Sequence, residues 1–443
     1  MPTFQKWLMA QVHRDDGIGI VARQWVISPG NTEKDFRAWL ESRRTGLILK
    51  ASIEISEQEY AGAVADLRNG RKTPTFPDWF NREGRERLDE QSHAFHKENP
   101  EITPSEYLHI LHLRLRKEIE TQHVIYIDIC HWVKMRHWIL DHPNKTPVYR
   151  SILETLRQLR AKQRIICPIS FPLFVELMRQ SDTRTREATA RLMDELSDGI
   201  CLQKPRDLIR TEIQQQITRS MFGDRALDLM EWVWTKAGWI AGERLPVSEA
   251  FSLKDNEYLQ KTFVDLMWET KLEDVIDGID QKRFPHMDGE ALASAYNTDA
   301  TFYHEKKMSF AEVLAYEKAH LFRLMVKQPF DEIAMEYHSR YPDQVAKLLT
   351  EKESHQKPSP LVLPFMQIVA GINAIFIMSR EAFSPNDLAD AEHAALALPY
   401  CDTFFCDSPL SHKLNAKPLR LNQAYGTNVV GAPTAFLKVI SDL

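Results

Sequence analysis

Short runs of apolar, β-branched residues recur along the 443-residue chain and predict the strands of a small sheet. The first run is Val124–Ile129, the second is Arg164–Ile169 and the third is Cys401–Cys406. Asn428–Val430 is a shorter run of the same kind and predicts an edge strand. A helical spacing of apolar residues follows each of the first three runs. Because strands that alternate with helices are typical of a parallel sheet, the pattern predicts an α/β fold.

Two helix starts carry a recognisable capping sequence. Thr103-Pro104-Ser105-Glu106 and Ser384-Pro385-Asn386-Asp387 each place a hydroxyl at the N-cap, proline at the first helical position and an acid at the third. Residues from about 181 to 380 read as a long helical region. The helices predicted there are Met230–Trp234, Tyr258–Ile279 and Phe310–Leu349.

The longest apolar stretch is Leu361–Met378, which is long enough to be considered as a membrane span. Polar or helix-breaking residues interrupt it, namely Pro364, Gln367, Gly371 and Asn373. We therefore predict a buried core helix and no association with a membrane. The amino terminus lacks a signal-peptide pattern, because Gln5, Lys6 and Gln11 interrupt its apolar residues.

Composition limits the classes of function. The net charge of −6 provides no overall basic field, so any binding of nucleic acid has to use local patches. The five cysteines form no CxxC pair and no zinc-finger spacing, which indicates reduced thiols in a cytoplasmic protein. The few glycines and the many Leu, Ala, Glu and Lys residues favour a mainly helical chain with a small sheet.

Residues 1–67 predict a small helical module, and residues 68–104 predict a linker rich in Gly, Pro, Asn and charge. The order Phe4…Trp7-Leu8…Asp16-x-Ile18-Gly19-x-x-Ala22-Arg23 resembles the YozE-type, SAM-like helical module. The resemblance covers about 40 residues and implies a unit for packing or interaction. We see no residues there that would carry chemistry.

Four acids stand where a parallel sheet could bring them together. Asp128 and Asp407 each end an apolar strand, and Glu176 and Asp390 lie on helices next to those strands. Strand ends and nearby helix turns can converge at one edge of a sheet, which is where open α/β sheets bind ligands. Because neighbouring carboxylates repel one another, their convergence favours Mg²⁺ or Mn²⁺ between them. The simpler alternative for Asp128 is an N-cap of the next helix.

The order of these acids resembles the PIN-like nuclease family. The residues that carry the resemblance are Ile125-Tyr126-Ile127-Asp128, Pro168-Ile169-Ser170…Glu176-Leu177 and Asn386–His393…Tyr400–Asp407. The family usually has Thr or Ser where Cys406 stands, so Asp402 could share the role of the fourth acid with Asp407. The resemblance covers residues 120–200 and 383–440.

This resemblance implies a three-layer PIN-like parallel sheet that a large helical insertion interrupts. The expected parts are a first α/β segment at 105–200, the insertion at 201–380 and a second α/β segment at 381–443. It also implies a metal-dependent phosphodiesterase, with RNA favoured over DNA, of a kind often found in toxins and defence effectors. The metal ligands would be Asp128, Glu176, Asp390 and Asp407, with Asp402 as a further candidate.

Several neighbouring residues have a simpler structural interpretation. We expect Asp387 to be a capping acid and Asp390, on the same face one turn later, to be the better ligand. His393 shares that face and is expected to support the site or the core rather than to bind metal. We expect Trp132 and Trp138, which stand at helical spacing, to belong to the core.

Basic residues flank the proposed acids. Arg184 and Arg186 follow the helix of Glu176, and Lys413 follows Asp407. Their positions suggest contacts with a phosphate backbone, and the alternative is a solvated helix face.

The sequence lacks the signatures of two other classes of phosphate-cleaving enzyme. A HAD-type phosphatase needs a second Asp two residues after the first, but position 130 is Cys. The chain also contains no GxxxxGK[ST] motif of a P-loop nucleotidase. The remaining alternative is a non-catalytic PIN-like scaffold that binds nucleic acid or assembles, for example as a homo-oligomer through the helical insertion.

Overall fold

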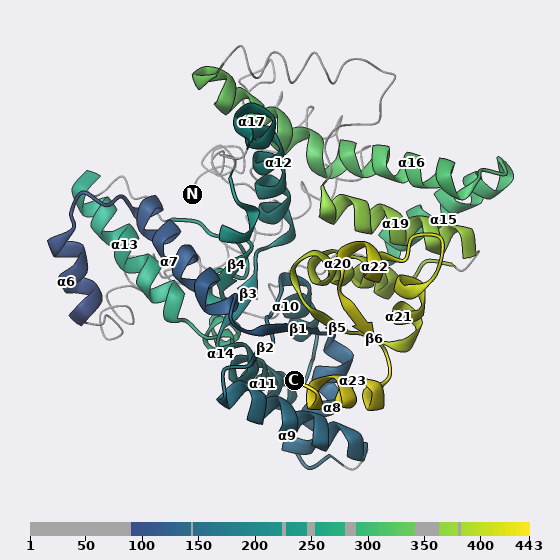
Figure 1. Ribbon diagram of the computed structural model, residues 1–443, viewed down its shortest axis with the longest axis horizontal. Coiled ribbons are helices and arrows are strands. Elements are labelled where there is room, and N and C mark those ends of the chain that lie inside the picture. Colours follow the sequence, from purple (N-terminus) through teal and green to yellow (C-terminus); the bar gives the residue numbers. More distant parts are fainter. Residues whose placement is uncertain are drawn as a thin grey trace, which may run out of the picture. The chain divides into compact units, whose positions relative to one another are not determined.

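Helices surround a small sheet in the computed structural model of this chain (Figure 1). The structure describes residues 90–142, 145–223, 227–245, 253–279, 289–341, 363–379 and 382–443. Contacts divide the chain between Arg87 and Leu88, and every described residue belongs to the second unit. The module predicted at 1–67 and much of the linker predicted at 68–104 lie outside the described residues.

The central sheet has four parallel strands in the order β2-β1-β5-β6. Their bounds are β1 (His123–Ile127), β2 (Ile165–Ile166), β5 (Thr403–Phe405) and β6 (Asn428–Val430). In the register, Ile125 lies opposite Thr403, and Thr403 lies opposite Asn428. The predicted α/β fold with a small parallel sheet is therefore confirmed. β1, β2 and β5 are shorter than the apolar runs that predicted them, whereas β6 has the predicted bounds, Asn428–Val430.

A second, antiparallel pair consists of β3 (Ile200–Leu202) and β4 (Trp234–Lys236). Ile169, in the segment after β2, forms a parallel bridge with Cys201 of β3, so β3 lies beside the first part of the sheet. The predicted insertion therefore includes, near its start, a strand that packs beside the sheet. The helix predicted at 230–234 is wrong, because Leu229–Glu231 forms a 3₁₀ turn and Trp234 pairs with Leu202. Its β-branched and aromatic residues suit a strand once a partner is available.

Helices cover both faces of the sheet. Successive side chains of a strand point to opposite faces, and β5 follows this rule. Phe404 contacts Tyr126, which in turn contacts His393 of α20. Phe405 stacks between His131 of α8 and Phe436 of α23. The helices that carry these residues are α8 (Ile129–Ile139), α20 (Pro385–Tyr400) and α23 (Pro433–Ser441).

The remaining helices connect and flank this arrangement. Their bounds are α6 (Glu90–Glu98), α7 (Pro104–Ile119), α9 (Pro147–Ala161), α10 (Phe171–Met178), α11 (Thr183–Ser197), α12 (Pro205–Phe222), η4 (Ala237–Trp239), α13 (Leu253–Glu269), α14 (Leu272–Asp277), α15 (Gly289–Glu305), α16 (Phe310–Leu321), α17 (Lys327–Arg340), α19 (Pro364–Ser379), α21 (Ser408–Asn415) and α22 (Leu421–Tyr425).

The capping predictions are confirmed. Thr103 and Glu106 form a capping box at the start of α7, and Ser384 and Asp387 form one at the start of α20. Asp387 is thus a capping acid, as expected. The predicted single helix at 258–279 is two helices, α13 and α14, and the one predicted from Phe310 is interrupted by a π-helical segment at Phe322–Val326.

Within the apolar stretch predicted at 361–378, the residues from Pro364 onward lie in α19 (Pro364–Ser379), and most residues of this helix are buried. This confirms the prediction of a core helix. Among the described residues, no helix combines the length and the apolar character needed to cross a membrane. Trp132 is fully buried, as predicted, whereas Trp138 is only half-buried and donates its indole N–H to the carbonyl of Thr146.

Candidate acidic site at the carboxyl edge of the sheet

Asp128 and Asp407 occupy equivalent positions on neighbouring parallel strands. Asp128 follows β1 and accepts a hydrogen bond from the backbone N–H of Cys130 through Oδ1, at 2.9 Å. Asp407 follows β5 and accepts one from the N–H of Leu410 through Oδ1, at 2.8 Å. Each residue therefore caps the next helix, and both lie at the carboxyl edge of the sheet. The capping alternative for Asp128 is confirmed, but it uses only one of the two carboxylate oxygens.

Asp390 of α20 lies close enough to Asp128 and Asp407 for their charges to affect its carboxyl group. Burial, followed by the negative charges of Asp128 and Asp407, raises the pKa of the Asp390 carboxyl to about 7. Among the described residues, no hydrogen bond or ion pair holds the Asp390 side chain. A carboxyl group in this setting is costly to ionise, and a cation or a proton would relieve the repulsion.

Glu176 is connected to this group through His393, which lies one turn after Asp390 on α20. His393 Nε2 is 3.0 Å from Glu176 Oε2, and its side chain is 1% exposed compared with 22% for Glu176. Burial lowers the pKa of His393, but the charge and hydrogen bond of Glu176, together with Asp128 and Asp390, raise it to about 9. The imidazole is therefore protonated at neutral pH and donates to the Glu176 carboxylate.

The buried hydroxyl groups of Tyr126 and Ser170 extend the hydrogen-bond network from His393. Tyr126 Oη lies 2.7 Å from His393 Nδ1 and 2.5 Å from Ser170 Oγ. When both nitrogens of His393 carry a proton, Nδ1 donates to Tyr126, and the Tyr126 hydroxyl can donate to Ser170. Ser170 also caps α10, the helix that carries Glu176. The network thus ties the orientation of Glu176 to strand β1.

The sequence prediction missed the role of Tyr126. A tyrosine among the aliphatic residues Val124, Ile125 and Ile127 was the available signal, because a buried tyrosine hydroxyl usually needs a hydrogen-bond partner. Ser170 entered the sequence interpretation only as one of the residues that carry the PIN-like resemblance. His393 was expected to support the site or the core, and its contacts with Glu176 and Tyr126 agree with that expectation.

Asp402 lies at the opposite edge of the sheet. It precedes β5, and its carboxylate accepts a hydrogen bond from the N–H of Val124, near the start of β1, at 2.7 Å. Five residues of extended strand span about 16 Å, which separates Asp402 from Asp407 by far more than one coordination shell. We therefore remove Asp402 from the proposed metal ligands.

The flanking basic residues differ in their surroundings. Arg186 is buried and donates to the carbonyl of Gln180 at 2.8 Å, so we remove it from the proposed phosphate contacts. Arg184 is exposed on α11. Lys413 is half-buried, and its ammonium lies 3.7 Å from the centre of the Phe376 ring. Arg184 and Lys413 remain predicted contacts.

These acids lie near one another, but they do not form a complete coordination shell for a metal ion. No group of three or more His, Cys, Asp and Glu side chains within the described ranges is arranged so that it could hold a metal ion. The structure supplies an acidic edge at which one carboxylate oxygen of Asp128 and one of Asp407 each accept a helix-capping hydrogen bond. Side-chain movement would be needed for these residues to share an ion.

Comparison with known proteins adds no further assignment, because no protein family model, curated protein or solved structure matches the chain.

Proposed function

We propose that this protein is a metal-dependent phosphodiesterase that hydrolyses RNA or DNA, with RNA the favoured substrate. The supporting observation is the meeting of Asp128, Asp407 and Asp390 at the carboxyl edge of adjacent parallel strands, where two of the carboxylates raise the pKa of the third. The PIN-like resemblance of the sequence supplies the reaction class and the preference for RNA.

The donor chemistry of these residues fits Mg²⁺ or Mn²⁺. Asp128 and Asp407 each keep one carboxylate oxygen that the capping hydrogen bond does not use. Asp390 brings a carboxylate with no partner in the described part of the chain. Hard cations prefer oxygen ligands of this kind, and a bound cation would supply activated water and stabilise charge on the phosphoryl oxygens. We assign Asp128, Asp407 and Asp390 to hold it.

Glu176 has a separate role in this proposal. Its carboxylate is oriented by protonated His393, and its partial exposure leaves it accessible to a substrate or to a ligand water. We assign Glu176 to complete the metal site from the helix side, with His393 as a positioning residue. Asp390, besides holding the cation, would orient the attacking water.

The alternative is a non-catalytic PIN-like scaffold that binds nucleic acid or assembles with other molecules. The observation that favours it is the lack, among the described residues, of any cluster already arranged to hold a metal ion. In that case the acids would act only as helix caps and as a buried network.

Cleavage of defined pools of RNA and DNA in the presence of Mn²⁺ tests the proposal. We expect wild type to cut RNA, and Asp128→Asn and Glu176→Gln to lose most of this activity. Asp402→Asn is the matched control, because it removes an acid from the opposite edge while keeping an oxygen that can accept from Val124 N–H. Cleavage that persists unchanged in Asp128→Asn would refute the assignment, and no cleavage of either pool by wild type favours the scaffold.

A further inference from the structure

Lys134 is an exposed cation on α8, the helix that Asp128 caps. The other lysine or arginine of this helix, Arg136, is buried. In an α-helix the bond from Cα to Cβ tilts toward the amino terminus, so the side chain of Lys134 leads back toward the start of α8. Cys130 lies one turn closer to that start and on the same face of the helix. The ammonium group is therefore directed toward the acidic edge.

The half-buried thiol of Cys130 lies between this lysine and the acids. Burial, followed by the charge of Asp128, raises the pKa of Cys130, and the charge of Asp407 also raises it. The charge of Lys134 lowers the same pKa. The thiol is thus close enough to Lys134, Asp128 and Asp407 to be affected by all three charges. A cation accordingly lies beside the acidic edge, on the side of α8.

Packing contacts connect Lys134 to the backbone that carries Asp407. Its Nζ lies 5.6 Å from the centre of the Tyr149 ring, on the neighbouring helix α9 (Figure 1). His131 Nδ1 is 2.8 Å from the Tyr149 hydroxyl, and its Nε2 is 2.9 Å from the carbonyl oxygen of Cys406. A carbonyl oxygen only accepts, so Nε2 donates to it and Nδ1 accepts from the hydroxyl. Cys406 directly precedes Asp407.

Lys134 forms no ion pair with any carboxylate in the described part of the chain. It therefore stays beyond ion-pair distance of Asp128 and Asp407, although their charges reach the same thiol. An ammonium group has three N–H donors, and lysine binds phosphate as a compact positive charge. This group is thus available to an anion that approaches the acidic edge, and it offsets part of the repulsion between the carboxylates and that anion.

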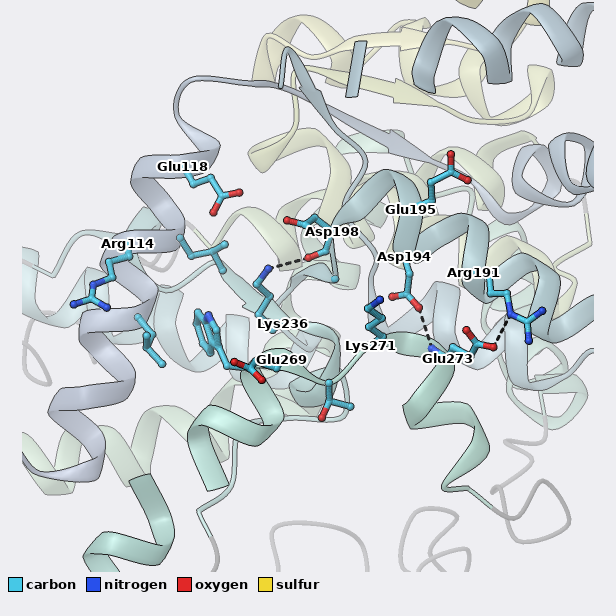
Figure 2. Close-up of a pocket in the computed structure, with 15 residues that line it drawn as sticks. Arg114, Glu118, Arg191, Asp194, Glu195, Asp198, Lys236, Glu269, Lys271 and Glu273 are labelled. Carbon is cyan, nitrogen blue, oxygen red and sulfur yellow. Dashed lines mark hydrogen bonds and ion pairs between the residues drawn. The ribbon is translucent and has the colours of Figure 1, made fainter. Parts of the chain in front are cut away.

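The pocket in Figure 2, of about 760 Å³, offers its cations a different setting. It lies toward the other edge of the sheet, because Gly199, which directly precedes β3, lines it. Six carboxylates line this pocket against four cations, so it has no excess of positive charge that would favour phosphate. Arg191, for example, pairs with Glu273 at 2.5 Å. The exposed Lys271 of this pocket is therefore a suitable comparison for Lys134.

We infer that Lys134 binds a phosphate group of the RNA strand at the acidic edge. The inference rests on the proposed nuclease function and adds a residue that contacts the substrate. Lys134 attracts the strand to the side of α8, and Tyr149 supports the ammonium group from below through its ring.

Fluorescence anisotropy of a labelled single-stranded RNA with the full chain tests this inference. EDTA prevents metal-dependent cleavage, and low ionic strength preserves the electrostatic contribution. We expect Lys134→Gln to weaken binding by about fivefold. Loss of one phosphate contact should also reduce the slope of log affinity against log salt concentration by about 0.7. Lys134→Arg keeps the charge and should bind within about twofold of wild type.

Lys271→Gln is the matched control, because it removes an exposed lysine from the pocket in Figure 2. It should change the affinity for RNA by less than about twofold. Three outcomes would overturn the inference. They are no saturable binding of RNA by wild type, equal affinities of Lys134→Gln and Lys271→Gln, and a loss in Lys134→Arg as large as that in Lys134→Gln.

Cleavage of the same RNA in Mn²⁺ separates this inference from the proposed function. If wild type cleaves the RNA and Lys134→Gln binds it as tightly as wild type, only the assignment of Lys134 fails. If Lys134→Gln weakens binding but wild type cleaves neither RNA nor DNA, the nuclease proposal fails. The phosphate contact then stands as part of a scaffold that binds RNA.

Discussion

Glu176 on α10 and His393 on α20 form an ion pair at 3.0 Å although 217 positions separate them in the sequence. The pair joins the two segments of the chain that build the parallel sheet, one on each side of the long helical region. His393 is buried, whereas Glu176 reaches the surface. The contact therefore connects an accessible carboxylate to the protein interior.

His393→Gln is expected to destabilise the protein in a manner that depends on pH. The folded-state pKa of about 9 is above the ordinary histidine value of 6.5, so the stabilisation is fully present below about pH 6.5 and is lost as pH rises through about 9. We expect a loss in unfolding free energy on the order of 2 kcal/mol at pH 6, which shrinks toward pH 9.5. Urea unfolding of wild type and His393→Gln in EDTA, between pH 6 and pH 9.5, measures this difference in unfolding free energy.

His131→Gln is the control for that measurement. His131 is also buried, but burial lowers its pKa to about 4, so the side chain stays neutral from pH 6.5 upward. The cost of its substitution should therefore be constant between pH 7 and 9.5. A flat difference between wild type and His393→Gln over the same range would contradict the assignment of a charged His393.

Asp390→Asn is expected to stabilise the metal-free protein at pH 8. The folded-state pKa of about 7 exceeds the ordinary aspartate value of 3.8, so the native state binds more protons than the unfolded state between these values. Wild-type stability should therefore fall as pH rises from about 4 through 7, and the amide, which cannot ionise, should lack this fall. Chemical unfolding in EDTA at pH 5 and pH 8 tests the sign. A variant that is less stable than wild type by the same amount at both pH values would show that repulsion from Asp128 and Asp407 is unimportant.

The sequence predicts those features of this site that depend on local order. Asp128 and Asp407 follow apolar runs, and parallel strands place both at one edge, so their proximity follows from topology. The same rule also places Asp402 away from Asp128 and Asp407, because a residue that precedes a parallel strand lies at the amino edge of the sheet. The capping boxes at Thr103 and Ser384 were predictable because they involve only neighbouring residues.

Features that depend on packing between distant segments were not accessible from one sequence. The pairing of β4 with β3 takes Trp234, the last residue of a segment predicted as a helix, into a strand. The contact of His393 with Glu176 likewise depends on how α20 packs against α10, which no local spacing specifies.

Mn²⁺ is expected to raise the melting temperature of the wild-type protein. A ligand that binds only the folded state stabilises it by about 2.7 kcal/mol at 100 times its dissociation constant. Asp128→Asn should abolish most of this shift, because it removes a charged oxygen donor while the amide oxygen can still accept from Cys130 N–H. Asp402→Asn should retain the shift. Thermal scans with and without Mn²⁺ provide the measurement, and equal shifts in wild type and Asp128→Asn would exclude Asp128 as a ligand.

Two substitutions at Asp407 separate its capping role from its charge. Asparagine caps helices about as well as aspartate, so Asp407→Asn should keep the bond from Leu410 N–H and change metal-free stability little. Asp407→Ala removes the cap and should cost about 1 kcal/mol in urea unfolding. If Asp407 also binds the cation, both variants should lose Mn²⁺ stabilisation and nuclease activity to a similar extent, despite their different stabilities. If Asp407→Asn instead behaves as wild type in both assays while Asp407→Ala alone is impaired, the carboxylate acts only as a helix cap, and the acidic site would have to be built without it.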